Sequence, residues 1–340
     1  MSKTTLSFTL LALLTMAMVS CNLFFGAINI PPHAVFDALF HSSGDGWAFI
    51  VMESRLPQAI TALLCGSALA ISGLLLQTAF SNPLADPAIL GVNSGAGLGV
   101  AIVMLLLGGS FTNDTFSLSG FILIITAAFI GATLVIMMLL FFSSILRSNL
   151  MLLIIGIMIS YITSSVISLL NYTSTAEGVH SYVIWGLGNF SGIARSQLPA
   201  FAITIGIGLI CSLALIKPLN ALLLGENYAT NLGINTQRTR IYLLATTGIL
   251  TATTTAFCGP ISFLGLAVPH MARLVLNTSD HRKLVPFTLL CGGNVALFCN
   301  LICNLPGDKG IIPLNVITPI LGVPIILYVI LFSKERKSFL

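Results

Sequence analysis

The sequence predicts an all-α polytopic membrane protein with about ten transmembrane helices. Of its 340 residues, 56% are hydrophobic and only 7% are charged, whereas soluble domains carry about 25% charged residues. Apolar stretches recur along the whole chain at the length of a crossing helix, which is roughly 20 residues for a bilayer core about 30 Å thick. The alternating strands of about ten residues that are typical of membrane β-barrels do not occur in the sequence.

Ten apolar stretches account for most of the chain. The predicted spans are residues 6–26, 56–79, 93–108, 119–142, 150–171, 198–216, 241–258, 261–276, 286–304 and 313–332. They leave no room for a separate soluble domain, so we expect a single transmembrane domain over residues 1–340. Ten spans divide into five plus five. An odd number in each half inverts the second half, which predicts a 5+5 inverted repeat.

The distribution of basic residues predicts the orientation of the chain. With an inside N-terminus, the inner side holds Lys3, Arg147, Lys217, Arg238, Arg240, Arg273, Arg282, Lys283, Lys334, Arg336 and Lys337. The outer side holds Arg55, Arg195 and Lys309. This split of 11 against 3 places both termini in the cytoplasm by the positive-inside rule. The basic residues are scattered, so the net charge of +4 does not indicate nucleic-acid binding.

The acidic residues bear on the source of energy for transport. All ten lie outside the predicted spans, whereas proton-coupled carriers commonly place a titrating carboxylate inside the membrane. A sodium site built from carbonyl oxygens would escape this test. Neither a GxxxxGK[ST] loop nor an HExxH motif occurs in the sequence. We therefore expect a transport subunit rather than an enzyme, with no cofactor bound in this chain.

Two local patterns predict details of helix geometry. Asp86 is a favourable N-cap and Pro87 a favourable first helical residue, which predicts a helix that begins at Pro87. Gly91, Gly95 and Gly99 recur every four residues, a spacing that lets helix backbones approach closely in lipid. The close contact lies either inside one subunit or between two subunits.

Three polar connections interrupt the spans. Segments 27–55 and 172–197 are predicted outside, and segment 217–240 is the longest polar stretch inside. In the inner segment, Gly225 and Gly233 are placed to bracket a short helix with an apolar and a polar face. This segment is either a solvated loop or a docking surface for a cytoplasmic partner.

A series of motifs gives the chain its resemblance to a known family. The motifs are Arg55-Leu56-Pro57, NPLADPAILG at 82–91, LGENYATNLGI at 224–234, GPISFLGLAVPHMAR at 259–273, DHR at 280–282 and TPILGVP at 318–324. In this order and spacing, from about residue 50 to the C-terminus, they resemble the FecCD-type permeases of ABC importers. That family handles iron–siderophores, haem and vitamin B12.

The resemblance implies an assembly in the bacterial inner membrane. A second copy of the chain would complete a homodimer with twenty spans around a central pathway. Two ATPase subunits, which bind ATP and Mg, would lie below it, and one extracytoplasmic substrate-binding protein would dock above it.

The resemblance also assigns roles to individual residues. Segment 224–234 resembles the coupling helices that enter a cleft of the ATPase, and its coupling residues are Leu224, Gly225, Glu226, Ala229, Leu232 and Gly233. Ser148 and Asn149 resemble the inner gate between the fourth and fifth spans. Arg55 and Lys309 are the expected docking residues for the binding protein.

The chain departs from the family pattern at four places. Relatives often have arginine at the positions of Met151, Gln58 and Asn304, the last of which is near the end of the ninth predicted span. Ile311-Ile312-Pro313 replaces an ELP motif. Because Gln58 and Asn304 carry no charge, we expect weaker electrostatic steering of the binding protein than in typical relatives.

The expected function is the import of a ferric siderophore, powered by separate ATPase subunits. Vitamin B12 and haem are the alternatives within the same class. A ferric siderophore and vitamin B12 are both bulky chelates. We expect apolar and neutral polar groups to contact such a cargo. A self-contained secondary carrier is the competing class, and a structural membrane scaffold without substrate flux is a third.

Overall fold

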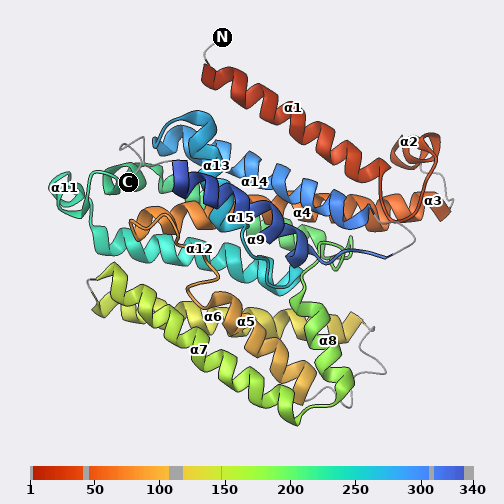
Figure 1. Ribbon diagram of the computed structural model, residues 1–340, viewed down its shortest axis with the longest axis horizontal. Coiled ribbons are helices and arrows are strands. Elements are labelled where there is room, and N and C mark those ends of the chain that lie inside the picture. The colour runs from red at the N-terminus through yellow and green to blue at the C-terminus, as the bar shows by residue number, and fades with distance from the viewer. Residues whose placement is uncertain (1–2, 41–45, 107–117, 147, 306–309, 333–340) are drawn as a thin grey trace. The chain divides into compact units, whose positions relative to one another are not determined.

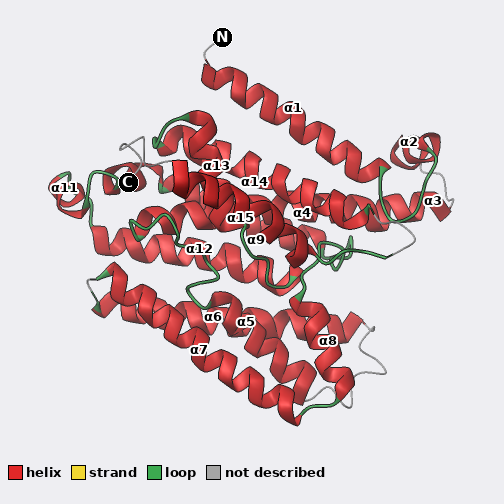
Figure 2. Ribbon diagram, in the orientation of Figure 1, coloured by secondary structure: helices red, strands yellow, loops and turns green. Residues whose placement is uncertain are grey.

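The computed structural model describes residues 3–40, 46–106, 118–146, 148–305 and 310–332. These residues form helices joined by turns and loops, with no strand among them (Figure 2). This confirms the all-α prediction. The chain divides into one unit made of Met1–Ile71, Asn189–Gly206 and Ile261–Leu340, and a second made of Ser72–Gly188 and Ile207–Pro260. The single domain over 1–340 stays a prediction.

The first unit is built around α14. It contains α1 (Lys3–Phe24), α2 (Pro32–Phe40), α3 (Gly46–Phe49), the π-helix η1 (Ile50–Arg55), α13 (Leu264–Leu276), α14 (His281–Asn304) and α15 (Leu314–Phe332), with the first parts of α4 (Leu56–Ala79) and α9 (Leu198–Ala214). Helix α1 lies alongside α14, and α13 packs against both α14 and α15 (Figure 1).

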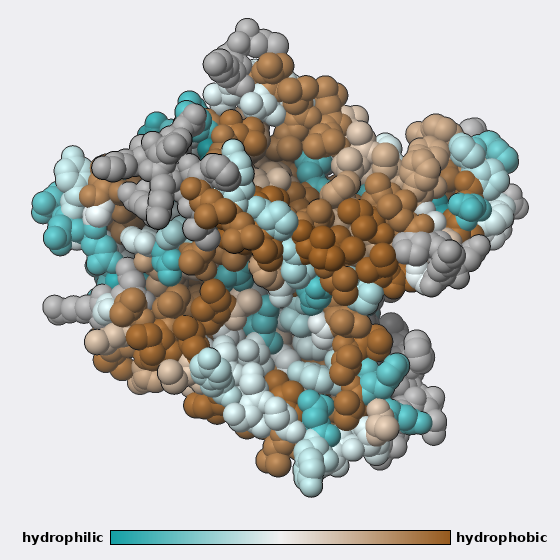
Figure 3. Space-filling model, in the orientation of Figure 1, coloured by the Kyte–Doolittle hydropathy of each residue, from teal (hydrophilic) through white to brown (hydrophobic). Residues whose placement is uncertain are grey.

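The exposed side chains of α1 are apolar, as a bilayer requires. Leu10, Leu13 and Met16 are 58%, 63% and 70% exposed, and Figure 3 shows brown, apolar side chains over this helix. Hydrocarbon accepts such side chains at no cost, whereas backbone polar groups must be satisfied within the helix.

Amide side chains join α1, α14 and α4 inside the first unit. Asn300 donates to Asn22 Oδ1 at 2.8 Å and accepts from Gln58 Nε2 at 2.9 Å. Asn304 is 8% exposed and donates to the carbonyl of Asn300 at 2.9 Å. Interhelical amides of this kind hold helices together in lipid. Gln58 and Asn304, two of the departures from the family pattern, therefore belong to the packing of this unit.

The second unit is built around α6. It contains α5 (Val92–Ala101), the π-helix η2 (Ile102–Leu106), α6 (Leu118–Ile145), α7 (Asn149–Thr173), α8 (Ala176–Gly186), α10 (Ile216–Leu222), α11 (Glu226–Asn231) and α12 (Thr236–Cys258), with the remaining parts of α4 and α9. A Cβ on Gly95 would lie 2.6 Å from the carbonyl oxygen of Gly131, and one on Gly99 would meet the backbone of Ala127. The predicted close packing at the repeated glycines thus occurs inside one chain, between α5 and α6.

Every predicted span coincides with a helix, although not every helix is long. Six helices are long and apolar enough to cross a membrane alone, and α9 with α10, bent by 51°, makes a seventh. The remaining three predictions match the shorter apolar helices Val92–Leu106, Leu264–Leu276 and Leu314–Val329. The number of ten crossings is therefore supported only roughly within the described part of the chain.

The turn before α5 differs from the prediction. Helix α5 begins at Val92, after Gly91 with φ of 81°, and not at Pro87. The residues in between form successive tight turns, because the carboxylate of Asp86 accepts a hydrogen bond from Ala88 N at 2.8 Å. An aspartate that bonds the backbone two residues on closes an Asx-turn rather than capping a helix. Burial raises the pKa of Asp86 to about 6.

Candidate functional site: the coupling segment and the inner gate

The short helix predicted in the inner polar segment is present as α11. Gly225 precedes it with φ of 98°, and Gly233 follows it with φ of 82°. A Cβ added at either glycine would meet no atom within 4 Å. Glycine is therefore required for its backbone conformation and not for lack of space, because residues with a Cβ are strained at positive φ.

The C-terminal end of α11 is a Schellman motif. Ile234 N donates to the carbonyl of Ala229 at 3.1 Å, and Gly233 N donates to the carbonyl of Thr230 at 2.9 Å. This pair of bonds satisfies the last carbonyls of the helix and turns the chain sharply. Asn235 then caps α12, so the short helix is held firmly at its C-terminal side.

Large apolar side chains are exposed on α11 and at both of its ends. Leu224, Tyr228 and Leu232, spaced four residues apart, are 62%, 53% and 58% exposed. Ala229 is completely buried and anchors the helix on its other side. An exposed apolar row in a polar segment is typical of a protein-binding surface. Tyr228 was missing from the predicted coupling residues, although it is a large side chain inside the predicted short helix, four residues before Leu232.

Arg240 on α12 connects α11 to the end of α6. Its Nη2 donates to Glu226 Oε1 at 3.2 Å, and its Nη1 donates to the carbonyl of Leu146 at 3.2 Å. The side chain of Arg240 is 8% exposed and that of Glu226 is 47% exposed. Gln237 adds a second link, since its Nε2 donates to the carbonyl of Ser144 at 2.8 Å. Sequence reasoning counted Arg240 only as an inner basic residue and did not predict this pairing.

The predicted inner gate follows directly on this connection. Ser148 lies two residues after Leu146, and its hydroxyl accepts from Met151 N at 3.4 Å, which caps α7. Asn149 is the first residue of α7, and its side chain lies outside the described part of the structure. Arg240 therefore binds the backbone immediately before the segment predicted to gate.

Arg55 lies in a different environment from the exposed docking position that we expected. It is 5% exposed, and its guanidinium donates to the carbonyls of Leu23 at 2.8 Å, Phe24 at 2.9 Å and Ile28. The last carbonyls of a helix have no partner within it, and a cation there is favourable. Arg55 thus caps α1, which explains its burial. Lys309, the other predicted docking residue, lies outside the described residues.

Arg195 is the exposed member of the predicted outer basic set within the described chain. Its Nη1 lies 3.1 Å from Glu53 Oε1, and the two side chains are 53% and 38% exposed. Both partners remain accessible to water, so a docking protein can reach either charge.

A cavity of about 280 Å³ lies between the turn before α5 and helix α7. It is lined by Ala88, Ile89, Ser94, Ile157, Ser160, Tyr161 and Ser164. The lining combines apolar groups with hydroxyls and holds no charged side chain among these residues. This is the neutral, partly polar character that we expect around a bulky chelate.

Comparison with known proteins agrees with this architecture. The profile of the FecCD transport family matches residues 12–332. A vitamin B12 import system permease protein, BtuC, of Klebsiella pneumoniae subsp. pneumoniae is 34% identical over 295 residues, which is 86% of each chain. The protein of the same name from Escherichia coli O9:H4 is 34% identical over 287 residues, 84% of each chain.

A solved structure is similar over nearly the whole fold. It is described as an inward-facing conformation of a metal-chelate type ABC transporter, with 28% identity and a TM-score of 0.82. The similarity covers 97% of this chain and 99% of that one. With the family profile matching almost end to end, the chain belongs to the FecCD transport family and is a multi-pass membrane permease of the ABC importer type.

Proposed function

We propose that this permease imports a bulky metal chelate and that separate ATPase subunits supply the energy. The observation that carries the proposal is the family match over residues 12–332. Vitamin B12 is the first substrate to test, because the two relatives at 34% identity bear that name. A ferric siderophore, our expectation from the sequence, is the second, since the solved relative is described as a metal-chelate type transporter. Haem is the third.

The geometry around α11 supports a route for energy coupling. The exposed row of Leu224, Tyr228 and Leu232 offers an apolar surface to the ATPase. When α11 moves, Glu226 moves with it. Arg240 should then move to keep this ion pair, because a nearly buried guanidinium without its counter-charge is strongly disfavoured. Arg240 also holds the Leu146 carbonyl. The displacement therefore reaches the segment of Ser148 and Asn149, which acts as the inner gate in this proposal.

The proposed assembly has two copies of this chain, two ATPase subunits and one extracytoplasmic binding protein, with both termini of each chain in the cytoplasm. The charge split of 11 inner to 3 outer basic residues supports this orientation. For docking of the binding protein, the exposed pair of Arg195 and Glu53 is the best candidate among the described residues. Lys309 stays a candidate on the basis of the resemblance.

The neutral cavity beside α7 is the candidate contact for the chelate. Tyr161 in its lining is 67% exposed. Ser160 and Ser164, spaced four residues apart on α7, add two hydroxyl groups to the same lining. Hydroxyl groups form hydrogen bonds in many directions without imposing a charge. Such a lining suits a large cargo that must be released again.

Uptake into proteoliposomes tests this function. The permease is reconstituted with its ATPase and binding protein, and radiolabelled vitamin B12, a ferric siderophore and haem are compared with and without internal ATP. We expect ATP-dependent uptake of one chelate. Gly225→Pro should abolish it, because proline fixes φ near −65° whereas Gly225 has φ of 98°. Gly206→Ala is the control, because a Cβ there meets no atom within 4 Å.

Other outcomes would contradict the proposal in distinct ways. Uptake by the permease alone, driven by an ion gradient, would identify a secondary carrier. No flux of any chelate in an assembly that still hydrolyses ATP would exclude these substrates. Normal uptake by Gly225→Pro would remove α11 from the coupling route.

A further inference from the structure

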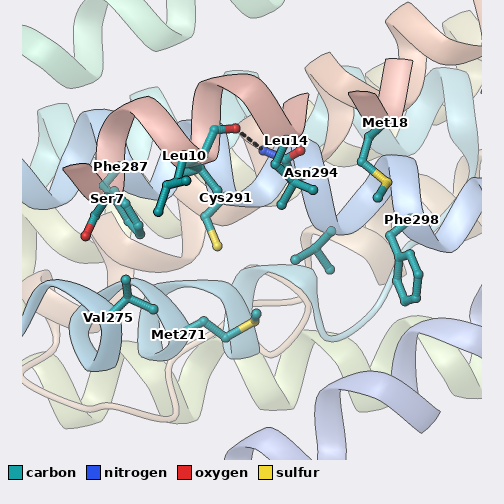
Figure 4. Close-up of a pocket in the computed structure, with 12 residues that line it drawn as sticks. Ser7, Leu10, Leu14, Met18, Met271, Val275, Phe287, Cys291, Asn294 and Phe298 are labelled. Atoms are coloured by element: carbon teal, nitrogen blue, oxygen red, sulfur yellow. Dashed lines mark hydrogen bonds between the residues drawn. The ribbon is translucent and has the colours of Figure 1, made fainter. Parts of the chain in front are cut away.

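A long apolar groove runs along α1 in the first unit. Its volume is about 440 Å³. It is lined by Ser7, Leu10, Leu11, Leu14 and Met18 of α1, by Met271 and Val275 of α13, and by Phe287, Cys291, Asn294, Val295 and Phe298 of α14. Figure 4 shows side chains of α1 and α14 on one side of this space and those of α13 on the other.

The groove has the length of one leaflet of a bilayer. On α1 the lining extends from Ser7 to Met18, and on α14 from Phe287 to Phe298. Each stretch advances eleven residues, or ~16 Å at the rise of an α-helix. Half of the hydrocarbon core is ~15 Å thick. A groove of this length reaches from the membrane surface to the middle of the bilayer.

The two helices run in the same direction, so the two stretches share their ends. The rings of Phe8 and Phe287 lie 5.3 Å apart near one end, and Asn22 and Asn300 are hydrogen-bonded at 2.8 Å beyond the other. Ser7 and Phe287 therefore mark the surface end of the groove, and Met18 and Phe298 mark its deep end (Figure 4).

The walls of the groove carry no charge along their length. Asn294 turns its amide nitrogen toward α1, where it donates to Thr15 Oγ1 at 2.7 Å and to the carbonyl of Leu11 at 3.4 Å. Leu10 and Leu14 are 58% and 43% exposed beside it. In a membrane protein, exposed apolar residues of this kind contact lipid chains.

Positive charge gathers at the surface end. Lys283 lies four residues before Phe287, which places it on the same face of α14 one turn beyond the groove. Arg282 is its exposed neighbour. Asp280 is the acidic residue at this end, and its carboxylate accepts from Arg282 N to cap α14. Among the described residues that flank this end on α14, two exposed cations and one anion leave it positive.

We propose that the groove binds an anionic glycerophospholipid, with an acyl chain between α1 and α13 and its headgroup beside Lys283 and Arg282. Basic residues at the membrane surface attract anionic headgroups. Lys283 and Arg282, both exposed at the surface end, favour a lipid with an anionic headgroup over an apolar helix of a second copy. The proposal depends on residence in a bilayer and not on the identity of the transported chelate.

Native mass spectrometry of the full-length, delipidated protein tests the headgroup site. The protein is titrated with phosphatidylglycerol and with phosphatidylcholine of identical acyl chains. We expect tighter retention of phosphatidylglycerol, and Lys283→Gln should weaken it about fivefold, the effect of one basic residue near an anionic surface. Lys283→Arg should restore it. Lys217→Gln, an exposed lysine that does not line the groove, is the matched control and should change nothing.

A second pair of variants tests the groove itself. Val275→Trp fills the space and should abolish retention of both lipids, whereas Leu13→Trp adds the same bulk outside the lining and should not. A phospholipid with a photoreactive acyl chain should label peptides 7–18 and 287–298. Equal retention of both lipids, equal effects of Lys283→Gln and Lys217→Gln, labelling elsewhere, or copy-to-copy cross-links through α1 would each overturn the proposal.

Discussion

Arg240 binds Glu226 at 3.2 Å across fourteen residues of sequence, from the first turns of α12 to the first residue of α11. The two partners differ in their access to water, because Arg240 is 8% exposed and Glu226 is 47% exposed. Loss of Arg240 leaves a carboxylate that water can solvate. Loss of the charge on Glu226 leaves a guanidinium that water can hardly reach. The pair is therefore asymmetric, and its two halves are expected to respond differently to substitution.

Replacement of Arg240 should uncouple α11 from the end of α6. Arg240→Ala removes the hydrogen bonds to Glu226 and to the Leu146 carbonyl, and should lower the free energy of unfolding by about 1–3 kcal/mol. ATP-dependent uptake should fall more than binding of the ATPase does. Thermal unfolding in detergent and co-purification of the ATPase measure the two effects. Arg238→Ala, an exposed neighbour on α12, is the control. Equal loss of uptake in both variants would show that position 240 has no special role.

The cap formed by Arg55 should make it a stability residue. Arg55→Ala leaves the carbonyls of Leu23, Phe24 and Ile28 without their donor, and should cost about 2–4 kcal/mol because hydrogen bonds to charged groups are the strong ones. Gly26→Val should also destabilise the protein, since a Cβ added at Gly26 would lie only 3.1 Å from the guanidinium of Arg55. Melting temperatures in detergent measure both.

The control for this prediction is Arg195→Ala. An exposed ion pair contributes only about 0–1 kcal/mol, so this variant should melt close to the wild type. If Arg55→Ala keeps wild-type stability but slows association of the binding protein, Arg55 is a docking residue after all.

Asp86 should make stability depend on pH. Burial raises its pKa from 3.8 to about 6, so the folded state favours the protonated form. The resulting stabilisation is complete below pH 3.8 and is lost as the pH rises through about 6. Asp86→Asn keeps an acceptor for Ala88 N and removes the titration. At pH 7 this variant should be more stable than the wild type by on the order of 2–3 kcal/mol.

The measurement is the difference in unfolding temperature between Asp86→Asn and the wild type across pH 4–7. Because all other titrating groups are common to both proteins, the difference isolates Asp86. A difference that stays constant over this range would mean that burial does not shift this carboxyl.

Impermeant thiol labelling tests the orientation. In a background without the seven native cysteines, Glu177→Cys in the outer segment should react in intact cells. Tyr228→Cys on α11 should react only in inverted vesicles. Both positions are exposed, so access to the reagent depends on the side of the membrane. Reaction of position 228 from outside would invert the topology.

The sequence predicted local features well because their causes are local. Hydropathy placed each of the ten predicted spans on a helix, although only six or seven of these are long enough to cross a membrane. The glycines at 225 and 233 located α11, because positive φ and helix termination depend on a few consecutive residues. The failure at Asp86 is also local. Its carboxylate has two backbone donors within reach, a helix N-terminus or an Asx-turn, and the residue types favour both.

The features that sequence reasoning missed depend on distant partners. In the sequence, Arg55 looks like an interfacial cation because it directly precedes an apolar span. Only the structure shows that the end of η1 lies beside the end of α1, whose carbonyls Arg55 binds. Gln58 and Asn304 appear as lost charges when compared with relatives. The structure joins them through Asn300, which is 242 residues from Gln58. No periodicity or spacing in one sequence contains such a pairing.

The side-chain amide of Asn22, in α1, has a consequence for biosynthesis. Asn22 meets Leu297 and Asn300 across 275 and 278 residues, so α1 leaves the ribosome long before α14 exists. At ~5–20 residues per second this delay is roughly 15–55 s. During that interval the amide nitrogen of Asn22 keeps its hydrogen bond to the carbonyl of Met18 within α1, at 2.8 Å, but the side chain lacks its partners on α14. A ribosome stalled before residue 281 would therefore release a chain whose first helix lacks α14, its main packing partner, which makes α1 a natural target for membrane quality control.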